Sequence, residues 1–492
     1  MNFVYYFLPE IAITSTLLLL LIFEILFPRK SLLALFISLL GISVAGFFSI
    51  DHLLNMNRQF FEVLSNLAQE RDYIRYILES IRFGPIERIF DLIFIIGTAI
   101  FVMLSYSYYR NKASGDYYFL IFSALLGSML IQKSENWATF ILSLEILSFS
   151  LYALVGFRRD LFSYEAATKY FFIGAFSTSF LILGLGFLYL TSYSLSFESL
   201  FQYFAFKSLF GLIEKKEFLA ILGIGFIIVG FGFKISAVPF HFWTPDVFEG
   251  SPSPTAGYIA TVSKVAVFAI MLKVLQGVLS SYPKLWGDLI LWISAFTMIV
   301  GNLAALRERS IKKILAFSTI ANAGYALTAI YAGGIEGFKS IIVFLFLYTI
   351  MTFGAFSVIQ MVSENNTNIE NLRGLYKRSP FLAVSLAIFM LSLAGVPPLA
   401  GFFAKFYVAY SVLITNNIVL AIWLFFNGII SYYYYLRVVY YAFSDGQKED
   451  IELNSLPLFI SSVCAILVIF FGIYPTSVLS FIESIFNKFI GG

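Results

Sequence analysis

Residues 230–264 read GFGFKISAVPFHFWTPDVFEGSPSPTAGYIATVSK, and this stretch decides how the rest of the chain is interpreted. Lys234 lies inside an apolar run, five residues before Pro239, and Lys264 lies well inside the next apolar run. A cation in a hydrocarbon-compatible segment is costly, and a proline there interrupts the helix. Stability alone therefore does not account for two such lysines, and the remaining sequence has to indicate what they do.

The composition is that of a membrane protein. Of the 492 residues, 60% are hydrophobic and 12% are charged, whereas soluble domains contain about 25% charged residues. Apolar runs of about 20 residues, long enough to cross a bilayer core of about 30 Å, recur along the chain. The strands of a membrane β-barrel would instead alternate over about ten residues. We therefore predict an all-α, polytopic membrane protein.

The composition also excludes several functions. A net charge of +3 is too small to indicate nucleic-acid binding. One cysteine, Cys464, rules out a disulfide framework and an iron–sulfur ligand set, and two histidines, His52 and His241, leave no bis-histidine haem site. We expect no metal and no cofactor to be bound by this chain. The first apolar run has no basic n-region or cleavage site and is expected to be a retained helix.

The apolar runs predict about fourteen membrane spans. They lie near 9–27, 31–50, 90–109, 117–133, 137–157, 165–191, 217–243, 254–280, 285–306, 311–332, 338–362, 380–415, 417–442 and 456–480. The 380–415 run is too long for one straight crossing and contains Pro397 and Pro398, so we expect a broken helix there.

The distribution of basic residues in short loops predicts the orientation. The basic residues of one set of alternate loops are Arg29, Lys30, Arg110, Lys112, Arg158, Arg159, Arg307, Arg309, Lys312, Lys313, Arg373, Lys377, Arg378 and Lys448. The opposite loops hold few. This set is predicted to be cytoplasmic, and an even number of spans then places both termini on the non-cytoplasmic side.

Residues 51–89 differ from the rest because their charges are mixed. Apolar residues recur there at steps of three and four, which predicts an amphipathic helix lying on the non-cytoplasmic face of the membrane or against a partner. A solvated helical hairpin without a special role is the alternative.

Four charged residues fall inside predicted spans: Glu145 in span 5, Lys234 in span 7, Lys264 in span 8 and Lys405 in span 12. A charge near the bilayer centre costs roughly 2.5–3.5 kcal/mol on insertion scales. A structural ion pair would explain one example, but one carboxylate and three lysines over four spans favour an ion or proton pathway. Burial lowers a lysine's pKa and a nearby carboxylate raises it, so we predict that Glu145 and Lys234 form a charge switch.

The prolines indicate how the spans are arranged. Pro239, Pro397 and Pro398 cannot donate to the carbonyl four residues earlier, and such breaks line hydrated cavities in transporters. A buried lysine with a break occurs in span 7 and again five spans later, which predicts two inverted five-helix repeats, spans 4–8 and 9–13. The expected domains are 1–116, with three spans and the amphipathic segment, 117–280 and 281–443, the repeats, and 444–492, with the last span.

Three further residues are secondary proton-relay candidates. His241 near the end of span 7 is placed to bridge the lysines to water, or is an ordinary satisfied histidine. Lys169 follows Glu165 by one helical turn, so a surface pair is the alternative. Asn322, a polar group in the middle of a span, relays a proton only through water.

The stretch from Phe231 to Phe268 closely resembles the signature of the antiporter-like membrane subunits of respiratory complex I and its relatives. Supporting segments are SLEILSFSLYALVGF, EAATKYFFIGAFSTSFLILG, IKKILAFSTIANAGYAL and AGVPPLAGFFAKFYV, so the resemblance covers most of residues 117–443. Within the family the chain is most similar to the N type (chain 2). The L type has a long C-terminal lateral helix, which this sequence lacks. The M type has a carboxylate at the position where this sequence has Lys405.

The resemblance implies redox-driven proton translocation by the buried Glu/Lys chain, with Lys405 delivering protons to the exit side. It implies that NADH, FMN, iron–sulfur clusters and quinone are used by partner subunits, and that the membrane partners are of the M, L, K and J types within the lipid bilayer. A bacterial inner membrane is the implied location, or a mitochondrial inner or thylakoid membrane if the chain is organellar.

The chain departs from the family where relatives have a histidine and this sequence has Asn322. The central relay must then depend on water or on neighbouring groups. The alternatives left open are a subunit of a Mrp-type sodium/proton antiporter, of a membrane-bound hydrogenase or of a plastoquinone-reducing complex. A stand-alone secondary transporter, whose lysines bind an anionic substrate, is the alternative of a different class.

Overall fold

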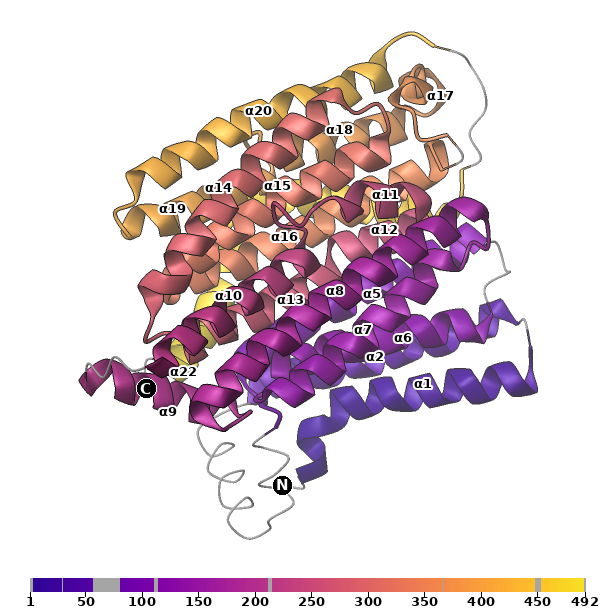
Figure 1. Ribbon diagram of the computed structural model, residues 1–492. Helices are drawn as coiled ribbons and strands as arrows, with labels where there is room; N and C mark the ends of the chain where they lie inside the picture. The colour runs from indigo at the N-terminus through magenta and orange to yellow at the C-terminus, as the bar shows by residue number, and fades with distance from the viewer. Residues whose placement is uncertain are drawn as a thin grey trace.

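The computed structural model describes residues 3–28, 30–55, 80–109, 114–210, 215–364, 366–446 and 453–490. These residues are almost entirely helical, which confirms the predicted all-α class. Within the described ranges, β-structure is limited to isolated bridges between loops. Figure 1 shows most helices running side by side along one common direction in a single bundle, as expected for membrane-crossing segments.

The structure contains long helices, several of them parts of one interrupted crossing, and a few short helices between them. In order they are η1 (Phe3–Phe7), α1 (Leu8–Leu26), α2 (Ser31–Asn55), α5 (Pro85–Tyr109), α6 (Gly115–Lys133), α7 (Trp137–Gly156), α8 (Leu161–Ser192), α9 (Phe197–Phe210), α10 (Lys215–Ile235), α11 (Trp243–Gly250), α12 (Ser253–Ala260), α13 (Val262–Leu272), the π-helix η2 (Lys273–Val278), α14 (Pro283–Arg307), α15 (Ile311–Ala332), α16 (Gly334–Val362), η3 (Ile369–Leu372), α17 (Leu375–Arg378), α18 (Pro380–Ala394), α19 (Ala400–Ile414), α20 (Ile418–Phe443), α21 (Ser455–Ile473) and α22 (Thr476–Ile490).

Twelve helices of the described part are long and apolar enough to cross a membrane. The two other predicted spans, 117–133 and 380–415, correspond to α6 and to the separate helices α18 and α19. The count of about fourteen crossings stays a prediction. The loops at 80–84, 134–136 and 279–282 lie at one end of the bundle, the Lys133 end, and those at 157–160 and 308–310 lie at the other, the Arg158 end. Figure 1 places the first and last described residues at the Lys133 end.

Three crossings are interrupted within the bundle. The predicted break in span 7 lies between α10, which ends at Ile235, and α11, which begins at Trp243, with Pro239 in the gap. The predicted break in span 12 separates α18 from α19, and Gly395 ends α18 in the left-handed region at φ +92°. Span 8 is also divided, at Thr261, a break that no proline or glycine in the sequence signals.

The interior of the bundle is formed by three crossings. In the apolar 18-residue windows of 253–278 and 334–362, 94% of the residues are buried, and in the window of 311–332 the share is 89%. The corresponding share is 33% for α1, α2, α8 and α21, whose outward faces are rich in exposed apolar side chains suited to lipid. Polar groups on the three interior crossings are therefore shielded from hydrocarbon by the surrounding helices.

The predicted amphipathic helix at 51–89 falls mostly outside the described residues. Helix α2 continues to Asn55 and α5 already begins at Pro85, so both ends of the predicted segment belong to spanning helices. Residues 56–79 are not described.

Candidate functional site

Glu145 projects from α7 toward α8. Its Oε1 accepts a hydrogen bond of 2.6 Å from the Thr178 hydroxyl. No ion pair of Glu145 occurs within the described ranges. A carboxylate inside a span is thus held by a neutral donor, and its charge remains available to act on cations nearby.

Lys234, the penultimate residue of α10, reaches α7 one helical turn beyond Glu145. Its ammonium donates to the Ser148 hydroxyl at 2.8 Å, and Ser148 in turn donates to the carbonyl of Leu144 at 2.7 Å. The direct contact implied by a Glu145–Lys234 switch pair is therefore absent from this structure. Residues three apart lie on one helix face, so Glu145 and Ser148 still present a carboxylate and a hydroxyl on the side of α7 that Lys234 approaches.

Lys264 closes the break in span 7 from the neighbouring span. Its side chain is 3% exposed, and its ammonium donates to the carbonyl of Ile235 at 2.9 Å. Ile235 is the last residue of α10, where carbonyls have lost their helical partners. A cation at the C-terminus of a helix also interacts favourably with the helix dipole. The break thus creates the acceptor that holds Lys264.

Lys405 occupies the same kind of position at the second break. Its ammonium donates to the carbonyls of Leu393 and Ala394, at 2.7 and 3.1 Å, which end α18. It also lies 4.9 Å from the centroid of the Tyr325 ring, a cation–π contact. A cavity of about 130 Å³ between α15, α18, α19 and α20 exposes part of Lys405.

The two break-associated lysines differ in register. Lys234 comes just before its break, whereas Lys405 lies in α19, five residues after its helix begins. Both spans combine a lysine with a break, as predicted for a repeated unit, but the contact with a helix end is made by Lys264 at the first break and by Lys405 at the second. The repeat itself stays a prediction.

Asn322 is buried in α15 within a small polar cluster. Its amide donates to the carbonyl of Ser318 at 2.9 Å and to its hydroxyl at 3.3 Å, and the Ser318 hydroxyl bonds the phenol of Tyr435 on α20. Asn322 and Tyr325 are one turn apart on α15, so the cluster lies close to the ring beneath Lys405.

Neither His241 nor Lys169 forms a hydrogen bond with Lys234, Lys264 or Lys405 in the described part of the chain. His241, in the break of span 7, is 7% exposed, and its Nδ1 has no hydrogen-bond partner within the described ranges. Lys169 pairs with Glu165 at 2.8 Å and with Asp246 at 2.7 Å on an open surface, which is the surface pair named as the alternative. The break residues Pro239, Pro397 and Pro398 have exposed side chains.

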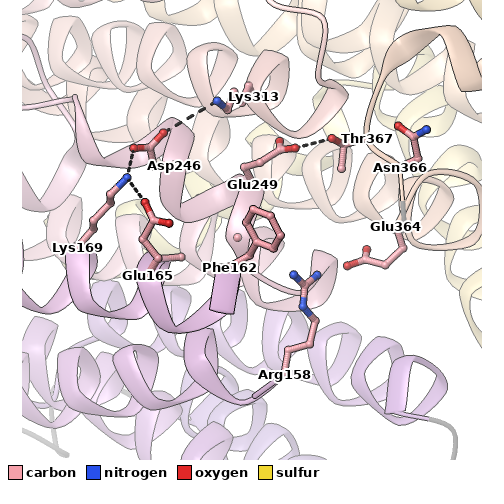
Figure 2. Close-up of a pocket in the computed structure, with 12 residues that line it drawn as sticks. Arg158, Phe162, Glu165, Lys169, Asp246, Glu249, Lys313, Glu364, Asn366 and Thr367 are labelled. Atoms are coloured by element: carbon pink, nitrogen blue, oxygen red, sulfur yellow. Dashed lines mark hydrogen bonds and ion pairs between the residues drawn. The ribbon is translucent and has the colours of Figure 1, made fainter. Parts of the chain in front are cut away.

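A charged vestibule opens at the Arg158 end. Figure 2 shows Lys169, Glu165 and Asp246 on one side of a cavity of about 430 Å³, with Arg158 and Glu364 on the other. Glu364 accepts from Ser253 at the start of α12 and pairs with the buried Lys312 at 2.9 Å. The vestibule therefore reaches the first turn of span 8, the span that carries Lys264.

The sequence argument missed a second set of buried charges. Arg88 pairs with Glu10 at 2.9 Å and with Asp91 at 2.8 Å, and Lys133 pairs with Asp91 at 2.7 Å and with Glu10. These four side chains are at most 8% exposed. The signal was Asp91 inside the apolar run of span 3. Lys133 appeared to be a loop residue and Arg88 part of the extramembrane segment, so the charges were not connected.

Among the described residues, no group of three or more His, Cys, Asp or Glu side chains is placed to hold a metal ion. The buried charges are ammonium, guanidinium and carboxylate groups. This set of groups is suited to exchanging protons and to electrostatic coupling.

Comparisons with known proteins agree with one another. The family described as "NADH:quinone oxidoreductase/Mrp antiporter, TM" matches residues 134–431. The NADH-quinone oxidoreductase subunit N 1 of Thermodesulfovibrio yellowstonii is 38% identical over 394 residues, 78% of this chain and 82% of that protein. The NADH-quinone oxidoreductase subunit N of Trichlorobacter lovleyi is 35% identical and covers 97% of this chain and 95% of its own length.

A solved structure extends the likeness to three dimensions. A chain of respiratory complex I from Thermus thermophilus, determined with bound aureothin, superposes with a TM-score of 0.77 at 27% identity. The superposition covers 96% of this chain and 98% of that chain.

Proposed function

Because the chain belongs to the NADH:quinone oxidoreductase/Mrp antiporter family of membrane subunits, we propose that it is the proton-translocating N-type subunit of an NADH–quinone oxidoreductase. NADH oxidation and quinone reduction, with the FMN and iron–sulfur clusters that they need, belong to partner subunits. Further antiporter-like and smaller membrane subunits adjoin this chain in the bilayer. The chain itself moves protons and is driven by its neighbours.

One observation carries this proposal: three lysines inside spans have no carboxylate within ion-pair distance in the described part of the chain. Lys234 donates to a hydroxyl, and Lys264 and Lys405 donate to backbone carbonyls at helix ends. A purely structural cation inside a membrane is expected to be paired. Held by neutral acceptors, each lysine can lose and regain a proton without leaving an unpaired carboxylate behind.

The proposed roles follow from position. Glu145, held between α7 and α8, adjusts the electrostatic potential at Lys234. Lys264 exchanges protons at the break in span 7, and Lys405 exchanges them through the cavity between α19 and α20. The Asn322 cluster, together with Tyr325, connects the two halves along α15. In this proposal the hydroxyl-rich cluster around Asn322 takes the role of the histidine that relatives have at this position.

The proposed architecture keeps the divisions 1–116, 117–280, 281–443 and 444–492, with inverted repeats in the two central parts. Support comes from the breaks in spans 7 and 12, which lie five spans apart and are each accompanied by a lysine. We place the Arg158 end on the cytoplasmic side and both termini on the other side, following the basic loops.

The alternatives are a related antiporter, hydrogenase or plastoquinone machine, or a stand-alone transporter. Relatives that carry the subunit N name at 38% and 35% identity favour the first proposal. Purification separates the transporter alternative, since a chain that is isolated alone and active contradicts the subunit assignment.

The test is Lys264→Met in the intact complex. Methionine keeps the length and apolar packing of the side chain but cannot carry a proton, so the complex is expected to assemble while NADH-driven proton uptake into inverted membrane vesicles is lost. Lys377→Met is the matched control, because Lys377 is an exposed lysine paired with Asp445 outside the bundle. Normal proton uptake with Lys264→Met would contradict the proposed site.

A further inference from the structure

Helix α5 carries a row of buried polar groups across the whole bundle. Asp91, Thr98 and Ser105 are spaced by seven residues, and the side chain of each is fully buried. Seven residues are close to two helical turns, so the three groups share one face at intervals of roughly 10 Å. This face is turned toward α6 and α12, and each group has a polar partner there.

The first position, near the Lys133 end, is the buried charge cluster. Asp91 accepts from Lys133 at 2.7 Å and from the amide of Gln132 at 3.1 Å. Gln132 also donates to the carbonyl of Glu87, whose carboxylate lies 3.5 Å from the ammonium of Lys273. The side chain of Lys273 is 18% exposed. Asp91 thus lies one side chain away from the partly exposed pair of Glu87 and Lys273 at the Lys133 end.

The middle position joins three helices. The Thr98 hydroxyl lies 3.5 Å from the phenol of Tyr258 on α12. Ser128 on α6 lies close to the same phenol and donates to the carbonyl of Ala124 at 2.9 Å. All three residues are fully buried. Midway along α5, a phenol and two hydroxyls thus lie close together in the interior of the bundle.

The third position leads to the vestibule. Ser105 and the phenol of Tyr117 on α6 are 3.0 Å apart. The ring of Tyr109 packs on that of Tyr117 with centroids 4.8 Å apart, and the phenol of Tyr108 interacts with both Arg158 and Glu364. Figure 2 shows the side chains of Arg158 and Glu364 directed toward each other on the same side of the vestibule.

This row is separate from the lysines of the proposed site. Span 8 lies between them, because Tyr258 on α12 is directed at α5 whereas Lys264 on α13 is directed at the end of α10. None of the hydrogen bonds along the row involves Glu145, Lys234, Lys264 or Lys405.

We propose that the row from Glu364 through Tyr117, Tyr258 and Asp91 is a second proton path through the chain. The proposal rests on the proposed proton-translocating function. A hydroxyl donates and accepts at once, so that with water between the positions each phenol or hydroxyl passes on one proton for each proton it receives and ends unchanged. Asp91 and Glu364 are the titratable groups at the two ends, and Lys133, Arg88 and Glu10 keep the charge around Asp91 balanced.

The decisive variant is Asp91→Asn combined with Lys133→Met in the intact complex. Removing one carboxylate and one cation together leaves the buried cluster neutral, so assembly is expected to be retained. Proton uptake per NADH oxidised, measured with a pH-sensitive dye in inverted vesicles, is expected to fall. Normal proton uptake in the assembled double variant would show that the cluster only fixes the packing of α1, α5 and α6, and would overturn the proposal.

A second pair of variants tests the phenols, with a control from the same helix. Tyr117→Phe and Tyr258→Phe remove hydroxyls of the row and are expected to lower proton uptake per NADH. Tyr118→Phe removes the neighbouring hydroxyl on α6, which is buried and has no partner within the described ranges, and is expected to change nothing. Equal behaviour of Tyr117→Phe and Tyr118→Phe would overturn the path.

Comparison with Lys264→Met separates the two proposals. If Lys264→Met abolishes uptake and the row variants are normal, only the second path fails. If Lys264→Met pumps normally and the row variants do not, the lysine site fails and the row remains. If all these variants pump normally, both assignments are wrong.

Discussion

At the scale of single residues, the main feature is that helix ends hold the buried lysines. The acceptors of Lys264 and Lys405 are carbonyls that the breaks in spans 7 and 12 leave without helical partners. Such carbonyls favour a cation, while burial opposes it. The two effects act against each other on the same ammonium, and this balance is what a proton-exchanging group requires.

Lys405→Arg tests whether charge alone suffices. Arginine retains donors for the carbonyls of Leu393 and Ala394 but does not release its proton in proteins. We expect Lys405→Arg and Lys405→Met to lose NADH-driven proton uptake to the same extent, with assembly checked by native gel electrophoresis. Substantial uptake in the arginine variant would mean that Lys405 supplies only a fixed charge.

Thr178→Val tests the support of Glu145. The hydrogen bond of 2.6 Å to the carboxylate is lost, and such bonds to charged groups are worth about 1.5–3 kcal/mol. We expect lower coupled NADH:quinone turnover in Thr178→Val and near-normal turnover in Thr178→Ser, which keeps the hydroxyl. Equal turnover in the two variants would show that the Thr178 hydroxyl does not support the function of Glu145.

At the scale of elements, the breaks depend on close approach of backbones. A Cβ added at Gly401 would lie 1.8 Å from the carbonyl oxygen of Ser392, so α18 and α19 cannot keep their contact with any larger residue. We expect Gly401→Ala to reduce the amount of assembled complex and its thermal stability. Gly186→Ala is the control, because a Cβ there meets no atom within 4 Å. An unchanged melting temperature in Gly401→Ala would contradict this packing.

The sequence predicts elements better than it predicts partners. Pro239, Pro397 and Pro398 remove backbone donors, and so the breaks beside them follow from local chemistry. The break at Thr261 has no such cause in the sequence and depends on the packing of span 8 within the bundle. The spans containing Glu145 and Lys234 were also predictable, but their bonds to Thr178 and Ser148 were not, since helix rotation is set by packing.

The buried charges near the Lys133 end illustrate the same limit. Asp91, Lys133 and Arg88 lie close to predicted span ends, where snorkelling to water is the ordinary expectation. Their burial arises because α1, α5 and α6 meet there and enclose them. Only the tertiary arrangement distinguishes a buried cluster from three surface charges.

At the scale of the whole molecule, the N-terminal helices are joined to the central bundle at the Lys133 end. The amide of Arg82 donates to the carbonyl of Lys133 at 2.7 Å, and that of Glu135 donates to Ser80 at 2.9 Å. Beneath these bonds lies the cluster of Glu10, Arg88, Asp91 and Lys133. Helices α1, α2 and α5 are therefore one body with the repeats rather than an appendage.

Arg88→Met tests how strongly this junction contributes to stability. The substitution leaves two buried carboxylates with one cation, and breaking a buried pair in this way costs about 3–5 kcal/mol. We expect a clearly lower melting temperature of the complex. Lys377→Met removes only an exposed pair and is expected to leave the melting temperature nearly unchanged. Similar melting temperatures for the two variants would show that the buried charge cluster at this junction contributes little to stability.

The contacts of Lys405 also fix a direction for its chemistry. An ammonium has three N–H groups, and two of them are engaged by the carbonyls of Leu393 and Ala394. In the proposed proton exchange the remaining N–H is the one that leaves, and after its departure the lone pair of the amine points in the same direction. The two carbonyls thus orient the exchanged proton away from the end of α18.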